Sequence, residues 1–163
     1  MKYNFFFLSI LLLTVTACAQ KDTSIEKSTY AYTSETVVED LDIPWGMAFL
    51  PDGSMLITEK SGELIHFKDG KKQLVQGVPS VYNRGQGGLL DIVLHPNYEE
   101  NGWIYFSYAS AEGDDNGGNT AIARAKLENN QLQSVEVLYK ATPNTNKGQH
   151  FGSRIAFDKE GYL

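Results

Sequence analysis

"GMAFLPDGSMLITEKSGELIHFKDG", residues 46–70, is the stretch that decides the fold of this chain. Its apolar runs are interrupted by the dipeptides Asp52-Gly53 and Ser61-Gly62. Glycine tolerates the positive φ of tight turns, so such dipeptides between apolar runs are typical of β-hairpins. The three runs that we expect to form strands are 46–51, 54–60 and 63–70.

The rest of the chain after residue 36 has the same character. No window in it shows an apolar stripe at helical spacing, and "QLQSVEVLYK" at 131–140 alternates apolar and polar residues instead. The sequence therefore predicts an all-β domain over 36–163. Hydrophobic residues make up 42% of the chain and aromatic residues 12%, which indicates a folded body with a sizeable core.

A weak internal repeat narrows the architecture. Each copy is an apolar strand, a polar turn that contains glycine, and a second strand rich in aromatic residues, and the copies align with Ala48 on Val93 and Ala156. The copies are 46–58, 91–108 and 153–163. Repeats of about 40–50 residues built from short strands favour a β-propeller with one four-stranded sheet per blade. A β-sandwich with similar hairpins is the alternative.

The third copy reaches Leu163 before its second strand is complete. Two copies and part of a third cannot close a ring, and an open propeller leaves sheet faces and edges uncovered. We therefore expect the chain to be an N-terminal fragment that holds the first two to three blades of a longer protein.

The first twenty residues, "MKYNFFFLSILLLTVTACAQ", differ from the remainder. A lysine followed by a short apolar run predicts a secretory signal peptide over 1–17. Val15 to Cys18 also resembles the bacterial lipobox, in which the cysteine is lipidated and becomes the mature N-terminus. The alternative is an ordinary signal peptide with an incidental cysteine. The polar segment 18–35 then predicts a tether that holds the domain at the cell envelope, facing the periplasm or the outer membrane.

The charge balance argues against one class of partner. The net charge is −6 at pH 7, and no segment of the chain is strongly basic. We therefore expect no binding to nucleic acid.

Three motifs together carry a family resemblance: "PWGMAFLPDGSMLITEKSGEL" (44–64), "GQGGLLDIVLHPNYEENGWIYFSY" (85–108) and "HFGSRIAFDKEGYL" (150–163). They resemble the glucose/sorbosone dehydrogenase family, in particular its soluble PQQ-dependent aldose sugar dehydrogenases. The resemblance implies a six-bladed β-propeller that oxidises aldose sugars at C1 to lactones. It also implies PQQ as cofactor, calcium whose ligands do not map onto this segment, and a respiratory or dye electron acceptor.

The resemblance also implies roles for particular residues. His150 matches the catalytic base, and a histidine suits that task because its ordinary pKa near 6.5 leaves much of it neutral at neutral pH. Gln86 matches a glutamine of the PQQ and sugar pocket. Gln149 stands where some members carry an acidic residue. Arg84, two residues before Gln86, is a candidate to meet a PQQ carboxylate, and an arginine exposed on the loop is the alternative. Read without the family, His150 is a structural histidine at a blade edge and Gln86 faces water.

Other candidates offer less. The histidines have no metal-ligand spacing, so the sequence predicts no metal site of its own. The loop 111–119 lacks the ligand pattern of an EF-hand and predicts a solvated hairpin tip. The side chain of His66 is expected on the strand face opposite Ile65 and Phe67, where solvent is one possible environment, and Arg154 is expected to form an ion pair between blades. The alternative functions are a propeller that binds carbohydrate or protein without catalysis and a propeller lactonase, which would need a metal cluster at the channel.

Overall fold

The computed structural model describes residues 31–113 and 116–163. The chain divides into two units, 1–35 and 36–163. Of the first unit, residues 31–35 are exposed and have no regular secondary structure, and the predicted signal peptide and Cys18 lie outside the described residues. In the part that is described, no helix has the length and apolar character needed to cross a membrane.

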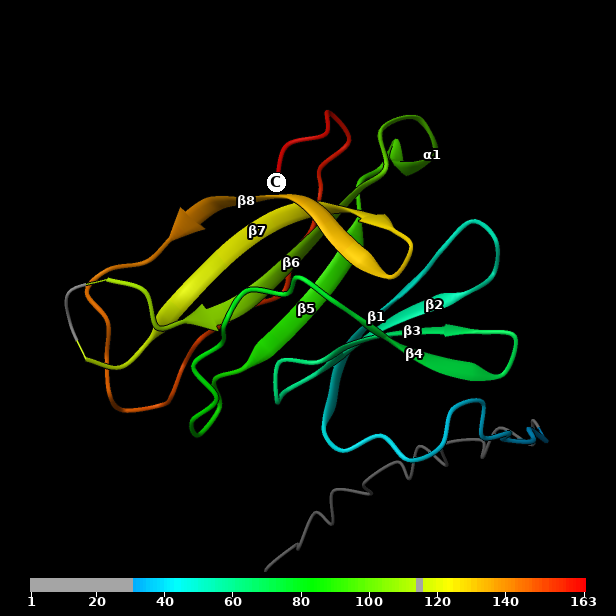
Figure 1. Cartoon of the computed structure of the whole chain (residues 1–163), viewed down its shortest axis with the longest axis horizontal. Coiled ribbons are helices and arrows are strands. Elements are labelled where there is room, and N and C mark those ends of the chain that lie inside the picture. Colours follow the sequence, from blue (N-terminus) through cyan, green and yellow to red (C-terminus); the bar gives the residue numbers. More distant parts are fainter. Residues whose placement is uncertain (1–30, 114–115) are drawn as a thin grey trace, which may run out of the picture. The chain divides into compact units, whose positions relative to one another are not determined.

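The second unit begins with a four-stranded antiparallel sheet in which each strand pairs with the next along the chain (Figure 1). Its strands are β1 (Pro44–Phe49), β2 (Met55–Glu59), β3 (Leu64–Lys68) and β4 (Lys71–Val75). Ile57 at the centre of β2 pairs with Met47 of β1 and Ile65 of β3. The predicted strands over 46–70 are confirmed, with ends displaced by a few residues.

A second sheet repeats this order. Its strands are β5 (Leu89–Leu94), β6 (Trp103–Ser110), β7 (Asn119–Glu128) and β8 (Gln131–Lys140). The short helix α1 (Tyr98–Asn101) joins β5 to β6 and ends at Gly102, whose φ of 68° suits glycine. The sequence pattern did not predict this helical turn, because four residues are too few to show helical periodicity.

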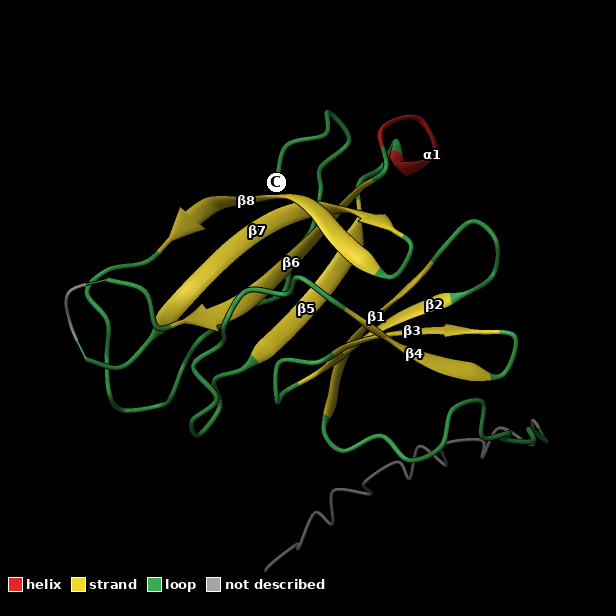
Figure 2. Cartoon of the chain, viewed as in Figure 1, coloured by secondary structure: helices red, strands yellow, loops and turns green. Residues whose placement is uncertain are grey.

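The two sheets are blades of a β-propeller, which confirms the predicted fold class (Figure 2). Two complete four-stranded meanders follow one another along the chain. The first strand of each sheet lies nearest the other sheet, since β1 contacts β5. The third repeat copy, 153–163, contains no described strand. It lies along the second sheet instead, where the Ile155 amide donates to the Asp91 carboxylate at 2.8 Å.

Two-residue turns close the outer hairpin of each blade. Asp69 and Gly70 join β3 to β4 with φ of 50° and 72°, and Asn129 and Asn130 join β7 to β8 with φ of 51° and 58°. Positive φ at both central positions is the type I′ geometry, which matches the twist of the flanking strands. The predicted turns at Asp52-Gly53 and Ser61-Gly62 belong to longer connections.

The main hydrophobic core lies between the two blades. Blade 1 contributes Leu56 and Leu64, which are 0% and 2% exposed, and blade 2 contributes Phe106 at 1%. Small residues of β7 complete this core: Ala121, Ala123 and Ala125. Burying one large apolar side chain contributes roughly 1.5–3 kcal/mol, so this interface holds the blades in a defined relation.

The innermost strands approach one another closely at Gly46. A Cβ atom built there would lie 3.0 Å from the Leu90 carbonyl oxygen and 3.2 Å from Asp91 Cα. Thr58 of β2 bridges the same point, since its Oγ1 accepts from the Gly46 amide at 2.8 Å and donates to the Leu90 oxygen at 2.6 Å. This contact between blades brings Trp45, next to Gly46, close to Leu90.

Candidate active site

A pocket of about 350 Å³ lies where the two blades meet the segment that follows β8. Its described lining consists of Trp45, Gln86, Leu90, His150, Phe151 and Gly152. The residues come from three parts of the sequence that the repeat and the family resemblance had singled out separately. Among these lining residues, His150 has the sole titratable side chain.

Irregular strand pairing brings two of the lining residues to the pocket. The register of β1 against β2 shifts between Pro44 and Gly46, so Trp45 lies at the irregularity. The register of β5 against β6 shifts between Leu89 and Ile92, which includes Leu90. Such bulges re-aim side chains and are frequent next to functional sites. Trp45 and Leu90 occupy equivalent positions in the repeat, so each of the two blades contributes the side chain at this position to the same pocket.

Hydrogen bonds from two backbone amides join the loop that contains Gln86 to the loop that contains His150. The Gln86 amide donates to the Gly148 oxygen at 2.8 Å, and the His150 amide donates to Gln86 Oε1 at 2.8 Å. These residues are 64 positions apart in the sequence, so tertiary folding alone brings them together. Because Gln86 Oε1 receives the His150 amide, the Nε2 amide group is what Gln86 can chiefly offer to a ligand.

The glycines of these loops are required by packing. A Cβ atom at Gly85 would lie 2.2 Å from the Gly148 oxygen, and one at Gly88 would lie 2.0 Å from the Lys60 oxygen. No side chain larger than hydrogen fits at either position without moving backbone. The glycines on either side of Gln86 therefore allow close backbone contact.

His150 is exposed and has a left-handed backbone, with a φ of 61°. A residue other than glycine in this region is uncommon and needs support from its surroundings. The next residue supplies it, because Phe151 is 5% exposed and packs with Leu90 and Ala109. Thr120 Oγ1 also donates a short hydrogen bond to the Phe151 oxygen. The chain thus holds His150 at the pocket through its neighbour.

Two other predicted site residues lie beside the pocket. Arg84 and Gln149 are both exposed and belong to the two joined loops, but neither side chain is part of the described lining. The structure therefore brings His150 and Gln86 together and leaves Arg84 and Gln149 at the loop surface. Their roles stay predictions.

Trp45 was not among the predicted site residues. It packs against the cluster of Leu90, Ala109 and Phe151. It also lines the pocket, and the Arg154 guanidinium lies over its ring at 5.4 Å from the centroid. The signal in the sequence was the aromatic residue immediately before a repeat copy, at the position that corresponds to Leu90.

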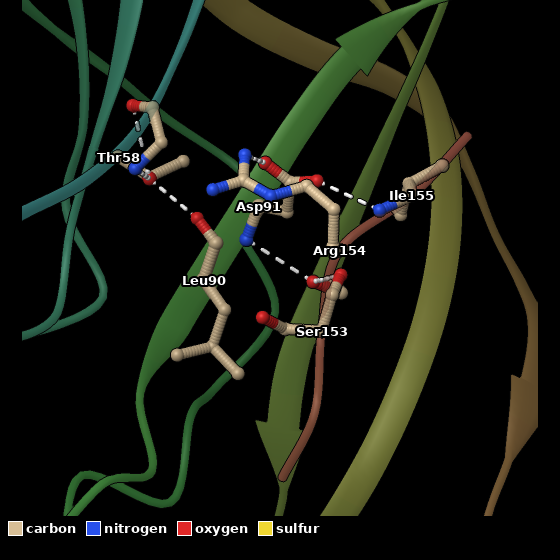
Figure 3. A network of polar contacts seen from close by, with 8 residues as sticks. Thr58, Leu90, Asp91, Ser153, Arg154 and Ile155 are labelled. Carbon is tan, nitrogen blue, oxygen red and sulfur yellow. Dashed lines mark hydrogen bonds and ion pairs between the residues drawn. The ribbon is translucent and has the colours of Figure 1, made fainter. Parts of the chain in front are cut away.

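Arg154 forms the ion pair that the sequence predicted. Its Nη1 donates to Asp91 Oδ1 at 2.7 Å, and the pair links the third repeat copy to β5 (Figure 3). Asp91 is 1% exposed, whereas the Arg154 side chain is 71% exposed. Asp91 lies in the motif 85–108, but no pattern in the sequence indicated that it would pair with Arg154.

The other two histidines have structural partners. His66 lies on the face opposite Ile65 and Phe67, as predicted, but this face is not open to solvent at His66: its ring nitrogens lie 2.6 Å from Asn130 Oδ1 and 2.9 Å from Ser54 Oγ, so it links the two sheets. His95 Nδ1 accepts from the Asn97 amide at 3.0 Å, as expected for a turn.

A metal site has no visible support in this part of the chain. Within residues 31–113 and 116–163, no three His, Cys, Asp or Glu side chains gather as metal ligands. Residues 114–115 of the loop 111–119 lie outside that part, as does Cys18.

The chain matches one family and its members. The family model for glucose / sorbosone dehydrogenase matches residues 41–163. Aldose sugar dehydrogenase YliI of Escherichia coli (strain K12) is 40% identical over 134 residues, which are 79% of this chain and 36% of that relative.

Solved structures agree with this match. The soluble aldose sugar dehydrogenase of Escherichia coli, in its apo form, superposes with a TM-score of 0.67 at 40% identity, over 72% of this chain and 35% of that one. The PQQ-bound aldose sugar dehydrogenase of Streptomyces coelicolor superposes with a TM-score of 0.66 at 30% identity, over 78% of this chain and 38% of that one. The chain thus spans little more than a third of these relatives.

Proposed function

The chain belongs to the glucose/sorbosone dehydrogenase family, and from that premise we propose that it forms part of a PQQ-dependent aldose sugar dehydrogenase. The reaction is the oxidation of an aldose at C1 to the lactone, with His150 as the general base. One observation supports this proposal above the others: His150 and Gln86, predicted from two distant motifs, are joined by a hydrogen bond of 2.8 Å at one pocket.

The residues present suit a flat quinone. The pocket offers the aromatic ring of Trp45, the apolar side chain of Leu90 and the backbone of Gly152. A Cβ atom at Gly152 would meet no heavy atom within 4 Å, so open space lies in front of this glycine. The described lining carries no arginine or lysine, so the carboxylates of PQQ need cations from elsewhere, and Arg84 on the neighbouring loop is our candidate.

The chemistry divides between the chain and the cofactor. The neutral imidazole of His150 accepts the proton of the anomeric hydroxyl group, which requires approach within about 2.6–3.2 Å. PQQ, when bound, supplies the acceptor for the hydride that leaves C1. Gln86 Nε2 can donate to a quinone or sugar oxygen, while its Oε1 holds the His150 backbone. Gln149, next to the base in the sequence but outside the described pocket lining, would hydrogen-bond a sugar hydroxyl in this scheme.

Further parts of the proposal rest on the family or on the unassigned N-terminal sequence. Calcium, as in the family, would be bound by residues other than those described here. Electrons would pass to a respiratory acceptor, or to a dye in an assay. Lipidation at Cys18 would tether the protein to the cell envelope.

The test uses the full-length protein with PQQ, calcium and a panel of aldoses, and follows dye reduction. His150→Ala should lower kcat by about 10²- to 10⁴-fold, the usual contribution of a general base, while PQQ still binds. His95→Ala is the matched control, because His95 supports a turn away from the pocket, and it should keep wild-type turnover. A wild-type protein without cofactor-dependent reduction of the dye would disprove the dehydrogenase proposal.

A further inference from the structure

Three consecutive residues after the pocket are tied to blade 2 (Figure 3). Ser107 Oγ donates to the Ser153 oxygen at 2.8 Å. Arg154 Nη1 donates to Asp91 Oδ1 at 2.7 Å, and the Ile155 amide donates to Asp91 Oδ2 at 2.8 Å. The segment has no strand pairing of its own, so these side chains replace the hydrogen bonds that a sheet would give it.

Asp91 is the centre of this arrangement. Its side chain is 1% exposed, and each carboxylate oxygen accepts one hydrogen bond from the segment. Its own amide donates to Ser107 Oγ at 3.1 Å, so Asp91 and Ser107 act from adjacent strands. A buried carboxylate is costly unless it is paired and hydrogen-bonded, and here both conditions are met by residues 154 and 155.

Both blades have the hydroxyl link to the next segment, but only blade 2 has a carboxylate on the inner strand beside it. In blade 1, Thr58 has the role of Ser107: it accepts from the amide of the inner strand and donates to a carbonyl of the next blade, at Leu90. The hydroxyl link therefore belongs to the repeat. The blade 1 position equivalent to Asp91 is Gly46, which has no side chain. The carboxylate is thus an addition in blade 2, where the next segment carries His150.

The backbone of that segment needs such support. His150, Gly152 and Ser153 have φ of 61°, 63° and 121°, and left-handed conformations at residues other than glycine persist only when their surroundings enforce them. Phe151 holds the segment before Gly152, and Asp91 with Ser107 holds it after Gly152. Gly152, which lines the pocket, lies between these two anchors.

We propose that Asp91 is a positioning residue for the His150 site: its buried carboxylate fixes residues 154 and 155 and thereby fixes His150 opposite Gln86. This inference rests on the proposed dehydrogenase function. A reacting group must be held to within about 0.5 Å, and a misplacement of about 1 Å can cost roughly 100-fold in rate. Asp91 touches neither substrate nor cofactor in this scheme and acts through the backbone.

The principal variant is Asp91→Asn in the full-length protein. The amide has the same shape but leaves one acceptor oxygen for two donors, so either Arg154 or the Ile155 amide faces an NH₂ group. We expect kcat to fall about 10- to 100-fold while KM for the aldose changes less than about twofold, because the sugar contacts remain. If this variant fails to fold, Arg154→Gln is the substitute, because the Arg154 side chain is exposed. It removes the charged partner of Asp91 and keeps the Ile155 amide, so it should lower kcat by less than Asp91→Asn does.

A second readout needs no cofactor. Hydrogen exchange of the peptide that covers 150–157 should be at least about tenfold faster in Asp91→Asn apo protein than in the wild type, because local opening becomes easier. The matched control is Glu59→Gln: Glu59 is also buried and accepts two backbone amides, from Asp42 and Ile43, in blade 1. It should speed exchange around 40–43, where the two amides lie, and leave 150–157 and kcat unchanged.

The outcomes separate clearly. Faster exchange of 150–157 with a selective loss of kcat supports the proposal. Unchanged exchange, or faster exchange with kcat within about twofold of the wild type, overturns it, and so does an equal loss of kcat in Glu59→Gln. A wild-type protein without turnover overturns the dehydrogenase proposal and, with it, the catalytic role proposed for Asp91. Hydrogen exchange of 150–157 still decides whether Asp91 holds the segment.

Discussion

At the scale of single residues, Gln86 has two separate tasks. Its Oε1 accepts the His150 amide, and its backbone amide donates to Gly148, so the residue first builds the pocket. Its Nε2 group then serves a ligand in the proposed function. A structural histidine and a solvent-facing glutamine were the alternatives from the sequence; the hydrogen bond from the His150 amide to Gln86 Oε1 brings both residues to one pocket, and their catalytic roles stay predictions.

The two tasks of Gln86 can be separated by substitution. Gln86→Glu keeps an acceptor for the His150 amide and removes the Nε2 donor, whereas Gln86→Leu removes both. We expect Gln86→Glu to weaken PQQ binding with little change in melting temperature. Gln86→Leu should weaken PQQ binding and also lower the melting temperature, because losing the hydrogen bond costs about 0.5–1.5 kcal/mol of stability. Fluorescence titration with PQQ and thermal unfolding measure the two effects. Equal PQQ affinity in the wild type and both variants would remove Gln86 from the cofactor site.

At the scale of elements, the turn between β1 and β2 is stabilised by a charged side chain. Asp52 Oδ1 accepts from the Ser54 hydroxyl at 2.6 Å, and its Oδ2 pairs with Lys68 Nζ at 2.8 Å. These hydrogen bonds, that from Lys68 first, hold the pKa of Asp52 well below its ordinary value of 3.8. The turn therefore contains a carboxylate that is favoured in its ionised form by folding.

This pKa shift has a definite sign in stability. A carboxyl group whose pKa is lowered by folding stabilises the fold fully at pH above its unfolded value near 3.8, and this contribution is lost progressively as the pH falls from there through the lower folded-state pKa. Asp52→Asn should therefore lower the urea midpoint at pH 7 and lower it by less at pH 2, where part of the contribution is already lost. Because the pair is exposed, the loss should shrink in high salt. A loss that is equal at both pH values would show that the charge does not matter.

The other elements show where patterns in sequence fall short. Apolar alternation located the strands, since side chains on a strand alternate between faces. It did not distinguish the two-residue turns at Asp69-Gly70 and Asn129-Asn130 from the longer connection at Asp52-Gly53, because turn type depends on backbone angles that the flanking strands impose. Alternation placed His66 opposite Ile65 and Phe67 but did not reveal what covers that face, because its partners Asn130 and Ser54 come from the other blade and from the connection between β1 and β2.

At the scale of the whole molecule, blade 1 has an exposed apolar face. A groove of about 540 Å³, larger than the His150 pocket, is lined there by residues such as Val37, Met47 and Phe49. Met47 corresponds in the repeat to Ile92, which is 1% exposed and packs between the blades. The groove has the character of a packing face for a further blade and, among its described residues, offers no group for acid–base chemistry.

The proposed attachment to the cell envelope is also a property of the whole chain. Lipidation of Cys18 predicts that the protein sediments with membranes, and Cys18→Ala should release it or leave its signal peptide attached. Fractionation of cells that express either form, with labelling by a fatty acid analogue, measures this directly. Recovery of unlabelled wild-type protein in the soluble fraction would favour the ordinary signal peptide.

The sequence by itself determined the strands, the repeat and the family, because each is written in local patterns and short motifs. It also identified His150 and Gln86 through motif resemblance. Only the tertiary structure decided that the two meet, that glycines 85 and 88 serve backbone contact, and that Asp91 holds the segment after the pocket. The physical reason is that these contacts join residues about 60 positions apart, or strands of different blades, and their geometry is set by packing between blades, which no local pattern records.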